Sequence, residues 1–88
     1  MEGVLEATFD GGRKEVCFAR IVGTDLILQT VGQRLSKSVL SLVRARLEDL
    51  KDETRFVLVT RIAKVIFRAQ MAFEAVAWMR ALQERIIR

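Results

Sequence analysis

The side chains that could carry out chemistry in this sequence are few. The chain contains no histidine, so it lacks the residue that most often serves as a general base or a metal ligand. Its single cysteine, Cys17, stands in an apolar stretch without a neighbouring base, and such a thiol behaves as a small hydrophobic side chain. We therefore expect no catalytic residue, no metal site, no cofactor and no small-molecule substrate.

Acidic side chains gather in one short segment, residues 48–53, and Lys51 lies among them. They are Glu48, Asp49, Asp52 and Glu53. Mixed charges in a short polar segment are typical of a solvated turn, whereas acid–base catalysis needs carboxylates in contrasting environments. The pair Gly11-Gly12 likewise fits a hairpin turn and does not match a phosphate-binding loop. The sequence therefore predicts that the protein is not an enzyme.

Basic residues outnumber acidic ones by 15 to 11, which gives a net charge of +4. This charge suits nucleic acid, an acidic protein surface or an anionic lipid headgroup, and it is equally compatible with a solvated basic surface. Nucleic acid is not expected as a partner, because most aromatic residues are in phase with the core and tyrosine is absent. A lone cysteine indicates a reducing compartment, so we expect a cytoplasmic location, with membrane or cytoskeletal association through the parent protein.

Seven short stretches have the alternation or the β-branched composition of strands. They cover residues 4–9, 15–22, 26–31, 39–43, 44–48, 56–60 and 64–69. The fifth stretch could also be helical by composition, and we prefer a strand because its neighbours on both sides are β-rich. In the second stretch, Val16 and Phe18 share one face, opposite Cys17 and its apolar neighbours.

Residues 70–88 have the apolar spacing of an amphipathic helix. The apolar face consists of Ala75, Trp78, Met79, Leu82 and Ile86. A helix of this length is marginal in water unless that face is covered. Seven antiparallel strands leave one open end that the helix can cover.

These elements predict a mainly β fold with one α-helix. We expect a seven-stranded antiparallel barrel or orthogonal sandwich, capped by the C-terminal helix. Proline, repeats and linker-like segments are absent, so residues 1–88 are expected to form a single domain, excised from a longer protein. On the helix, Phe73 and Val76 are expected to pack beside Trp78 against the sheet. The strand residues expected in this contact are Leu5, Phe18 and Leu28.

The motifs of these elements follow one another in an informative order. The strand motifs are Gly3-Val4-Leu5, Phe18 before Gly23-Thr24-Asp25-Leu26, Val39-Leu40-Ser41-Leu42, Phe56-Val57-Leu58-Val59-Thr60 and Val65-Ile66-Phe67-Arg68-Ala69. The helix motif, in which Leu82 follows Trp78 by four residues, is the most telling. Over essentially the whole chain this order resembles a pleckstrin-homology (PH) domain. Phosphotyrosine-binding and related domains share the superfold, so the resemblance is to a PH-like fold.

The resemblance implies phosphoinositide or anionic-membrane binding as one function. The family's usual clamp has a lysine late in strand one and an arginine early in strand two, and here Ala7 and Val16 stand at those positions. Basic residues nevertheless occur around three loops that meet at one end in the family. They are Arg13, Lys14, Arg20, Arg34, Lys37, Arg61 and Lys64. We keep lipid binding by this basic rim as the alternative function.

The preferred function is protein docking, which the family also performs. Val57 and Val59 interrupt the outward row of their strand, and Ile66 interrupts the outward row that contains Arg68. Exposed apolar residues flanked by basic ones are typical of a protein interface, although the helix or a neighbouring sheet could cover them. The edge strands could also pair with a partner strand. We predict a non-catalytic module that docks its parent protein onto a scaffold or cytoskeletal protein, or onto a second copy of itself.

Overall fold

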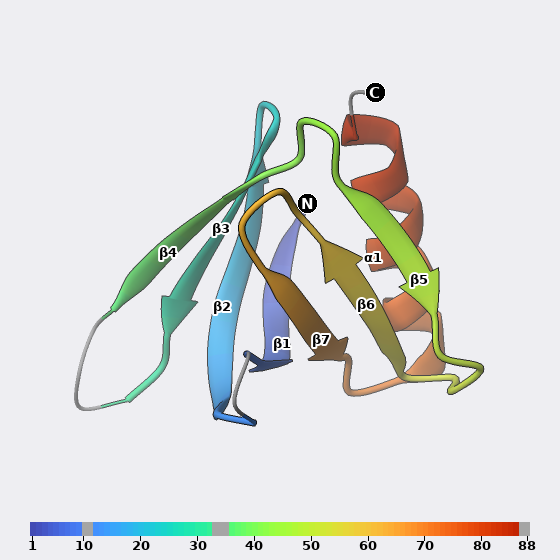
Figure 1. Ribbon diagram of the computed structural model, residues 1–88. Coiled ribbons are helices and arrows are strands. Elements are labelled where there is room, and N and C mark those ends of the chain that lie inside the picture. The colour runs from blue at the N-terminus through green and yellow to red at the C-terminus, as the bar shows by residue number, and fades with distance from the viewer. Residues whose placement is uncertain (10–11, 33–35, 87–88) are drawn as a thin grey trace.

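Seven antiparallel strands followed by one helix make up the described part of the chain, residues 1–9, 12–32 and 36–86, in the computed structural model (Figure 1). The strands are β1 (Glu2–Thr8), β2 (Lys14–Val22), β3 (Asp25–Thr30), β4 (Lys37–Ser41), β5 (Arg46–Asp49), β6 (Arg55–Val59) and β7 (Lys64–Arg68), and the helix is α1 (Ala72–Arg85). This arrangement confirms the predicted fold class, with boundaries that move by at most three residues. No helix within the described ranges is long and apolar enough to cross a membrane.

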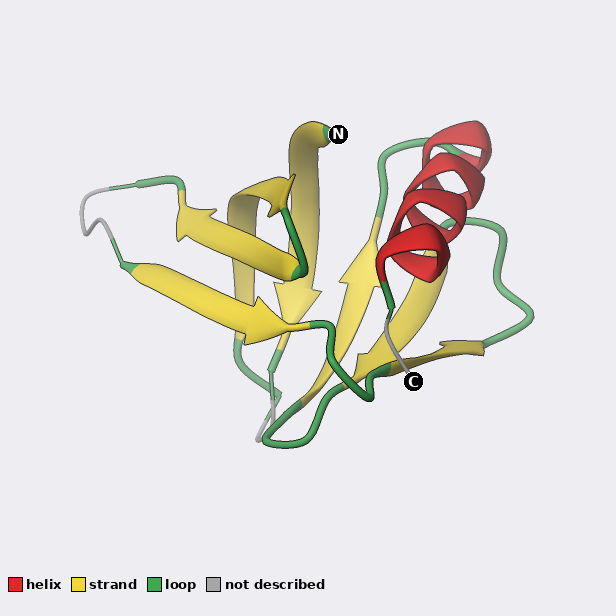
Figure 2. Cartoon of the chain, turned by 90° about the horizontal axis from the view of Figure 1, so that it is seen from above, coloured by secondary structure: helices red, strands yellow, loops and turns green. Residues whose placement is uncertain are grey.

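The strands form a single sheet in the order β4-β3-β2-β1-β7-β6-β5. The sheet has two halves, β1 to β4 and β5 to β7, and within each half the strands that follow one another along the chain are paired. The halves join where β7 pairs with β1, with Ala7 opposite Phe67. The sheet bends between the halves, and α1 lies beside β5 and β6 on its inner side (Figure 2). The outermost strands are therefore β4 and β5.

The core fills the concave side of the bent sheet. Each strand contributes its alternate residues, such as Leu5 and Ala7 from β1, because side chains of successive strand residues point to opposite faces. Helix α1 contributes Ala75, Trp78 and Leu82, and Trp78 is the largest fully buried side chain. The indole lies against the backbone of β1, because a Cβ added at Gly3 would be 3.6 Å from Trp78 Cζ2.

The predicted apolar face of the helix is confirmed, since Met79 and Ile86 also pack partly against the core. The predicted contacts of Phe73, Val76 and Phe18 are wrong, because these side chains are 67%, 49% and 40% exposed. The first two lie about a third of a helical turn or more away from the buried stripe. Phe18 points to the outer face of β2, opposite the direction of Cys17.

The fifth strand is confirmed as a strand and begins two residues later than predicted. Arg44 takes a left-handed conformation, with φ of 59°, and the Ala45 N–H donates to the carbonyl of Leu42 at 3.3 Å. This turn redirects the chain before β5, because an extended strand cannot contain a residue with positive φ.

Candidate functional site

The surface predicted for protein docking is only partly exposed. Val57 is 1% exposed, and Val59 and Ile66 are half-buried. Only Arg68 of the four predicted residues is exposed. The prediction that Val57 is available to a partner is therefore wrong.

On the outer face, Val57 lies between its two neighbouring strands, with Ile66 opposite it on β7. Glu48 lies directly opposite Val57 on β5. Its carboxylate reaches across β6 to the Lys64 ammonium at 3.8 Å and lies 3.5 Å from the Arg46 guanidinium. The aliphatic parts of such side chains cover apolar residues while their charged ends stay in water.

A larger group of exposed apolar side chains than the predicted one lies on the outer face of β1 and β2. Val4, Val16 and Phe18 are 38%, 48% and 40% exposed, and we call them the β1–β2 patch. Val4 lies directly opposite Phe18 in the β1–β2 pairing, and Val16 is two residues from Phe18 on the same face. The sequence carried a signal for this patch, the shared face of Val16 and Phe18, but not for Val4 beside them.

A shallow cleft of about 340 Å³ adjoins the β1–β2 patch. It is lined by Val4 and Val16 together with Glu6 and Arg68, which face each other across β1 and β7. These two charged side chains form no ion pair among the described residues, so both charges remain available to a partner. Arg68 therefore belongs to the rim of the β1–β2 patch. It does not flank an exposed Val57, as the sequence had predicted, because Val57 is buried.

In the pairing order of the sheet, the loops with the predicted basic rim lie on one side, but the bend sets the β6–β7 connection apart from the other two (Figure 1). The β1–β2, β3–β4 and β6–β7 connections follow the ends of β1, β3 and β6, and antiparallel pairing places all three on the same side. We call this the loop end. Lys14, Lys37 and Arg61 are exposed there, whereas Arg34 lies outside the described residues.

Comparison with known proteins finds the fold but no sequence relative. No protein-family model matches the chain, and no curated protein matches it. The solved pleckstrin homology domain of ArhGAP27 superposes with a TM-score of 0.79 at 16% identity, over 98% of this chain and 97% of that one. The chain has a PH-like fold.

Two larger fragments also match this PH-like domain. The linker-DH/PH domains of p115-RhoGEF give a TM-score of 0.81 at 21% identity. The DH/PH fragment of PDZRHOGEF, in a complex with human RhoA, gives 0.83 at 16% identity. Each match covers 98% of this chain but only 28% of the other, so the similarity lies within one part of those fragments.

The basic residues of this PH-like domain do not all converge. Arg20 is wrongly placed in the predicted rim, because it pairs with Glu2 and lies six residues along β2 from Lys14, about 20 Å away. Arg13 lies 5.3 Å from the centre of the Phe9 ring, and its Nε is 3.3 Å from the Glu15 carboxylate. Lys64 is held by Glu48, as described above. Within the described part of the loop end, Lys14, Lys37 and Arg61 are the cations without an ion pair.

The cysteine of the PH-like domain is part of the core. Cys17 is 0% exposed, and burial together with the nearby Glu15 charge raises the pKa of its thiol. A protonated, inaccessible thiol is a poor nucleophile. Within the described ranges, no group of three metal-ligating side chains comes together.

Proposed function

We propose that this PH-like domain is a non-catalytic interaction module that docks its parent protein onto a protein partner through the β1–β2 patch. The observation that carries the proposal is the side-by-side exposure of Val4, Val16 and Phe18 on one face of two paired strands. Single exposed apolar residues are ordinary on protein surfaces, whereas adjoining ones with a polar rim are typical of binding sites.

The patch continues along the outer face of the sheet. The Val31 N–H donates to the Val16 carbonyl at 2.9 Å, and the Val31 side chain is 61% exposed. On the next strands Val39, which is 51% exposed, lies opposite Ile27. Val31 thus adjoins the patch beside Val16, whereas Gln29 opposite Phe18 and Arg20 opposite Ile27 separate Val39 from it.

The surroundings of the patch favour a protein as its partner. Glu6 and Arg68 lie in the adjoining cleft with opposite charges, a mixture typical of the polar rim of a protein interface and unlike the uniform positive charge that binds polyanions. One structure similar to this chain is a DH/PH fragment in complex with human RhoA, and this chain matches 28% of that fragment. We propose a scaffold or cytoskeletal protein, or a second copy of the chain, in the cytoplasm.

The test replaces two patch residues by aspartate, Val16→Asp with Phe18→Asp. Both side chains are already exposed, so the double variant should keep its circular dichroism spectrum and its thermal midpoint within a few degrees. The wild-type domain and the variant are each immobilised and used to capture proteins from cell extract. Each protein that binds the wild type but not the variant is then purified. We expect the affinity of the purified partner to fall by about tenfold or more, as for a central interface residue. Sedimentation velocity tests self-association with the same pair.

The matched control is Ile62→Asp, which places the same charge on a residue that is 82% exposed in the β6–β7 connection. This variant should bind as the wild type does. Equal binding by the wild type, the control and the patch variant would show that the β1–β2 patch is not the docking surface.

The alternative function is attraction to an anionic membrane by the loop end. The observation in its favour is that Lys14, Lys37 and Arg61 share one end of the sheet. Glu15 lies among them and weakens the attraction for phosphate.

A further inference from the structure

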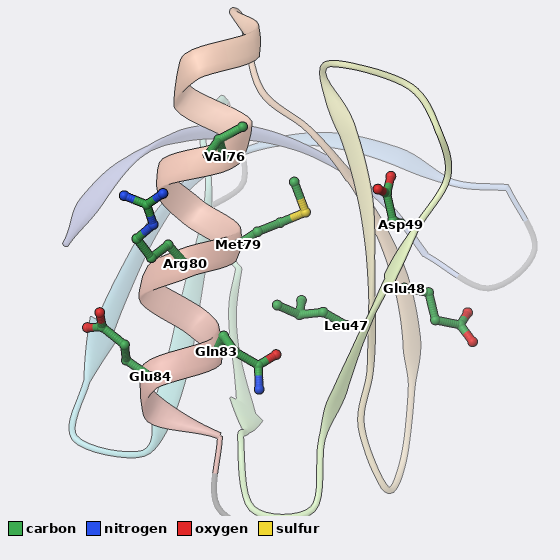
Figure 3. A pocket seen from close by; sticks show the side chains of 8 residues that line it. All are labelled: Leu47, Glu48, Asp49, Val76, Met79, Arg80, Gln83 and Glu84. Atoms are coloured by element: carbon green, nitrogen blue, oxygen red, sulfur yellow. The ribbon is translucent and has the colours of Figure 1, made fainter.

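The sheet ends in two edge strands, β5 and β4. β5 lies beside helix α1, and an open groove of about 510 Å³ runs between them. Figure 3 shows Leu47 and Met79 pointing toward each other across this groove, with Val76 above them on the helix. β4, in contrast, pairs only with β3 among the described strands, and the β3–β4 hairpin extends away from the helix (Figure 2). The edge of β4 is therefore accessible to another chain.

The backbone of β4 directs every second residue toward this open edge. At one end of the hairpin the Thr30 N–H donates to the Ser36 carbonyl at 2.9 Å. At the other end the Leu42 N–H donates to the Thr24 carbonyl at 2.8 Å. Bonded and non-bonded pairs alternate along an antiparallel ladder, so the even-numbered residues of β4 bond to β3 and the odd-numbered ones direct their N–H and C=O groups outward. The outward-bonding residues are Lys37, Val39 and Ser41.

We propose that β4 of one copy of the chain pairs antiparallel with β4 of a second copy, about a twofold axis at Val39. In this register Val39 lies opposite Val39 of the second copy, and Lys37 lies opposite Ser41 of the second copy. Each of these pairs brings together residues whose N–H and C=O groups point outward, so the open groups of both edges find partners. None of these residues belongs to the β1–β2 patch, so this second surface goes beyond the proposed function.

The side chains on the outer face suit a second copy as the occupant. Val39 is 51% exposed, and Ile27 beside it on β3 is half-buried. Directly opposite residues of paired strands share a face of the sheet. The proposed pairing therefore joins Ile27 and Val39 of both copies in one continuous apolar row, and Val39 gains an apolar neighbour on its open side.

Charge complementarity favours the same register. Lys37 and Asp25 form no ion pair within the described residues. Asp25 lies opposite Ser41 on the outer face, so the pairing places Lys37 two strands from Asp25 of the second copy. Two strand spacings are about 10 Å, a distance that a lysine and an aspartate side chain span together. The twofold axis repeats this contact at the other end, and it keeps the two Lys37 side chains apart.

The contact is small, because each copy contributes one strand of five residues. Interfaces of this size are weak and transient. We expect a monomer at about 10 μM and a substantial fraction of dimer at about 1 mM, which corresponds to a binding free energy near −4 kcal/mol. Such pairing joins copies where the parent protein is locally concentrated.

The test is sedimentation velocity of the whole domain at these two concentrations, combined with amide hydrogen exchange by NMR. The dimer should slow exchange at Val39 and Ser41 in proportion to its fraction. Exchange at Ser38 and Leu40 should change less, because these amides are already bonded to β3 in the monomer. Slowing at the odd-numbered amides alone is specific to the proposed edge.

A matched pair of variants locates the contact. Val39→Lys places a charge at the twofold axis, where it faces the same charge of the second copy, and should weaken association by about tenfold or more. Val16→Lys places the same charge on the same face of β2, at a residue that is 48% exposed, and should associate as the wild type does.

A charge exchange tests the register. Asp25→Lys should weaken association by about threefold, because exposed ion pairs contribute modestly. Adding Lys37→Asp to this variant should restore the wild-type affinity, since the two charges then attract again with reversed signs. Failure of the second change to restore association would contradict the register centred on Val39.

The proposal is overturned if the domain stays monomeric at about 1 mM, or if Val39→Lys associates as well as Val16→Lys. Association that is lost in Val16→Asp with Phe18→Asp but retained in Val39→Lys would assign it to the β1–β2 patch and also overturn pairing through β4. Loss of partner capture in the patch variant with retained dimerisation separates the two surfaces, so either can fail without the other.

Discussion

Asp52 shows how one side chain fixes a turn. Its Oδ1 accepts hydrogen bonds from the Thr54 N–H at 2.9 Å and the Thr54 hydroxyl at 3.0 Å, and its Oδ2 accepts one from Arg55 Nε at 2.9 Å. These bonds, the Thr54 N–H foremost, lower the pKa of Asp52 from 3.8 to about 2. The folded state therefore favours the ionised carboxylate.

We predict that this carboxylate stabilises the fold only above acidic pH. A lowered pKa in the folded state contributes stability that is fully present above pH 3.8 and is lost as the pH falls through 2. Asp52→Asn should lower the thermal midpoint by a few degrees at pH 7, and the difference from the wild type should shrink as the pH falls toward 2. Glu53→Gln, at the exposed next position, serves as the control and should leave the thermal midpoint unchanged both at pH 7 and near pH 2. A difference that persists undiminished near pH 2 would show that charge is not the cause.

Val57 marks the limit of sequence-based prediction at this scale. Alternation placed its side chain on the outer face correctly, but the pattern of one strand does not record what covers that face. Val57 lies between Glu48 of β5 and Ile66 of β7, and the Glu48–Lys64 ion pair spans the same strand, an arrangement that exists only after three strands have paired. Exposure depends on those neighbours, so it could not be read from the strand alone.

At the scale of elements, the strands and the helix were predictable because their local patterns agree with the fold. Residues 14–22 alternate, and the helix repeats its apolar positions every three or four residues. The order in which the strands pair could not be predicted as well from these local patterns. That β5 lies at the edge of the sheet beside α1 is decided by tertiary packing between segments more than 20 residues apart, so the groove between them has no local signal.

The loop end gives the prediction that belongs to this scale. Only three cations without an ion pair lie in the described part of the loop end, and Glu15 stands next to Lys14, so we expect weak attraction to vesicles that contain single phosphoinositides. Sedimentation with the vesicles should be seen at low salt, should disappear at physiological salt and should show no headgroup preference. Lys14→Ala with Arg61→Ala should abolish the low-salt binding. Arg20→Ala, at the other end of β2, is the control and should retain it.

A contrary outcome at the loop end would change the proposed function. Binding that prefers one headgroup, survives physiological salt and is lost in Lys14→Ala with Arg61→Ala would make lipid recognition the main activity. Binding graded only by vesicle charge would leave protein docking in place.

At the scale of the whole molecule, helix α1 both closes the core and forms part of the surface. One side of the helix closes the core through Ala75, Trp78 and Leu82, while Val76 on another side forms a wall of the groove. The β1–β2 patch lies on the outer face of the sheet, away from the helix. A substitution on α1 can therefore affect the stability of the fold or the lining of the groove separately, depending on its side of the helix.

Trp78 is the residue on which closure of the core depends most. A domain of this size has a free energy of unfolding of about 4–13 kcal/mol, and truncating a buried Trp to Ala costs about 3–5 kcal/mol. Because the indole is 2% exposed and lies against β1, Trp78→Ala should lose a large share of the free energy of unfolding. Urea denaturation should show this as a much lower midpoint. Phe73→Ala on the same helix removes a side chain that is 67% exposed and should change the free energy by less than about 0.5 kcal/mol. Equal losses in the two variants would mean that α1 stabilises the fold through its length and not through its buried face.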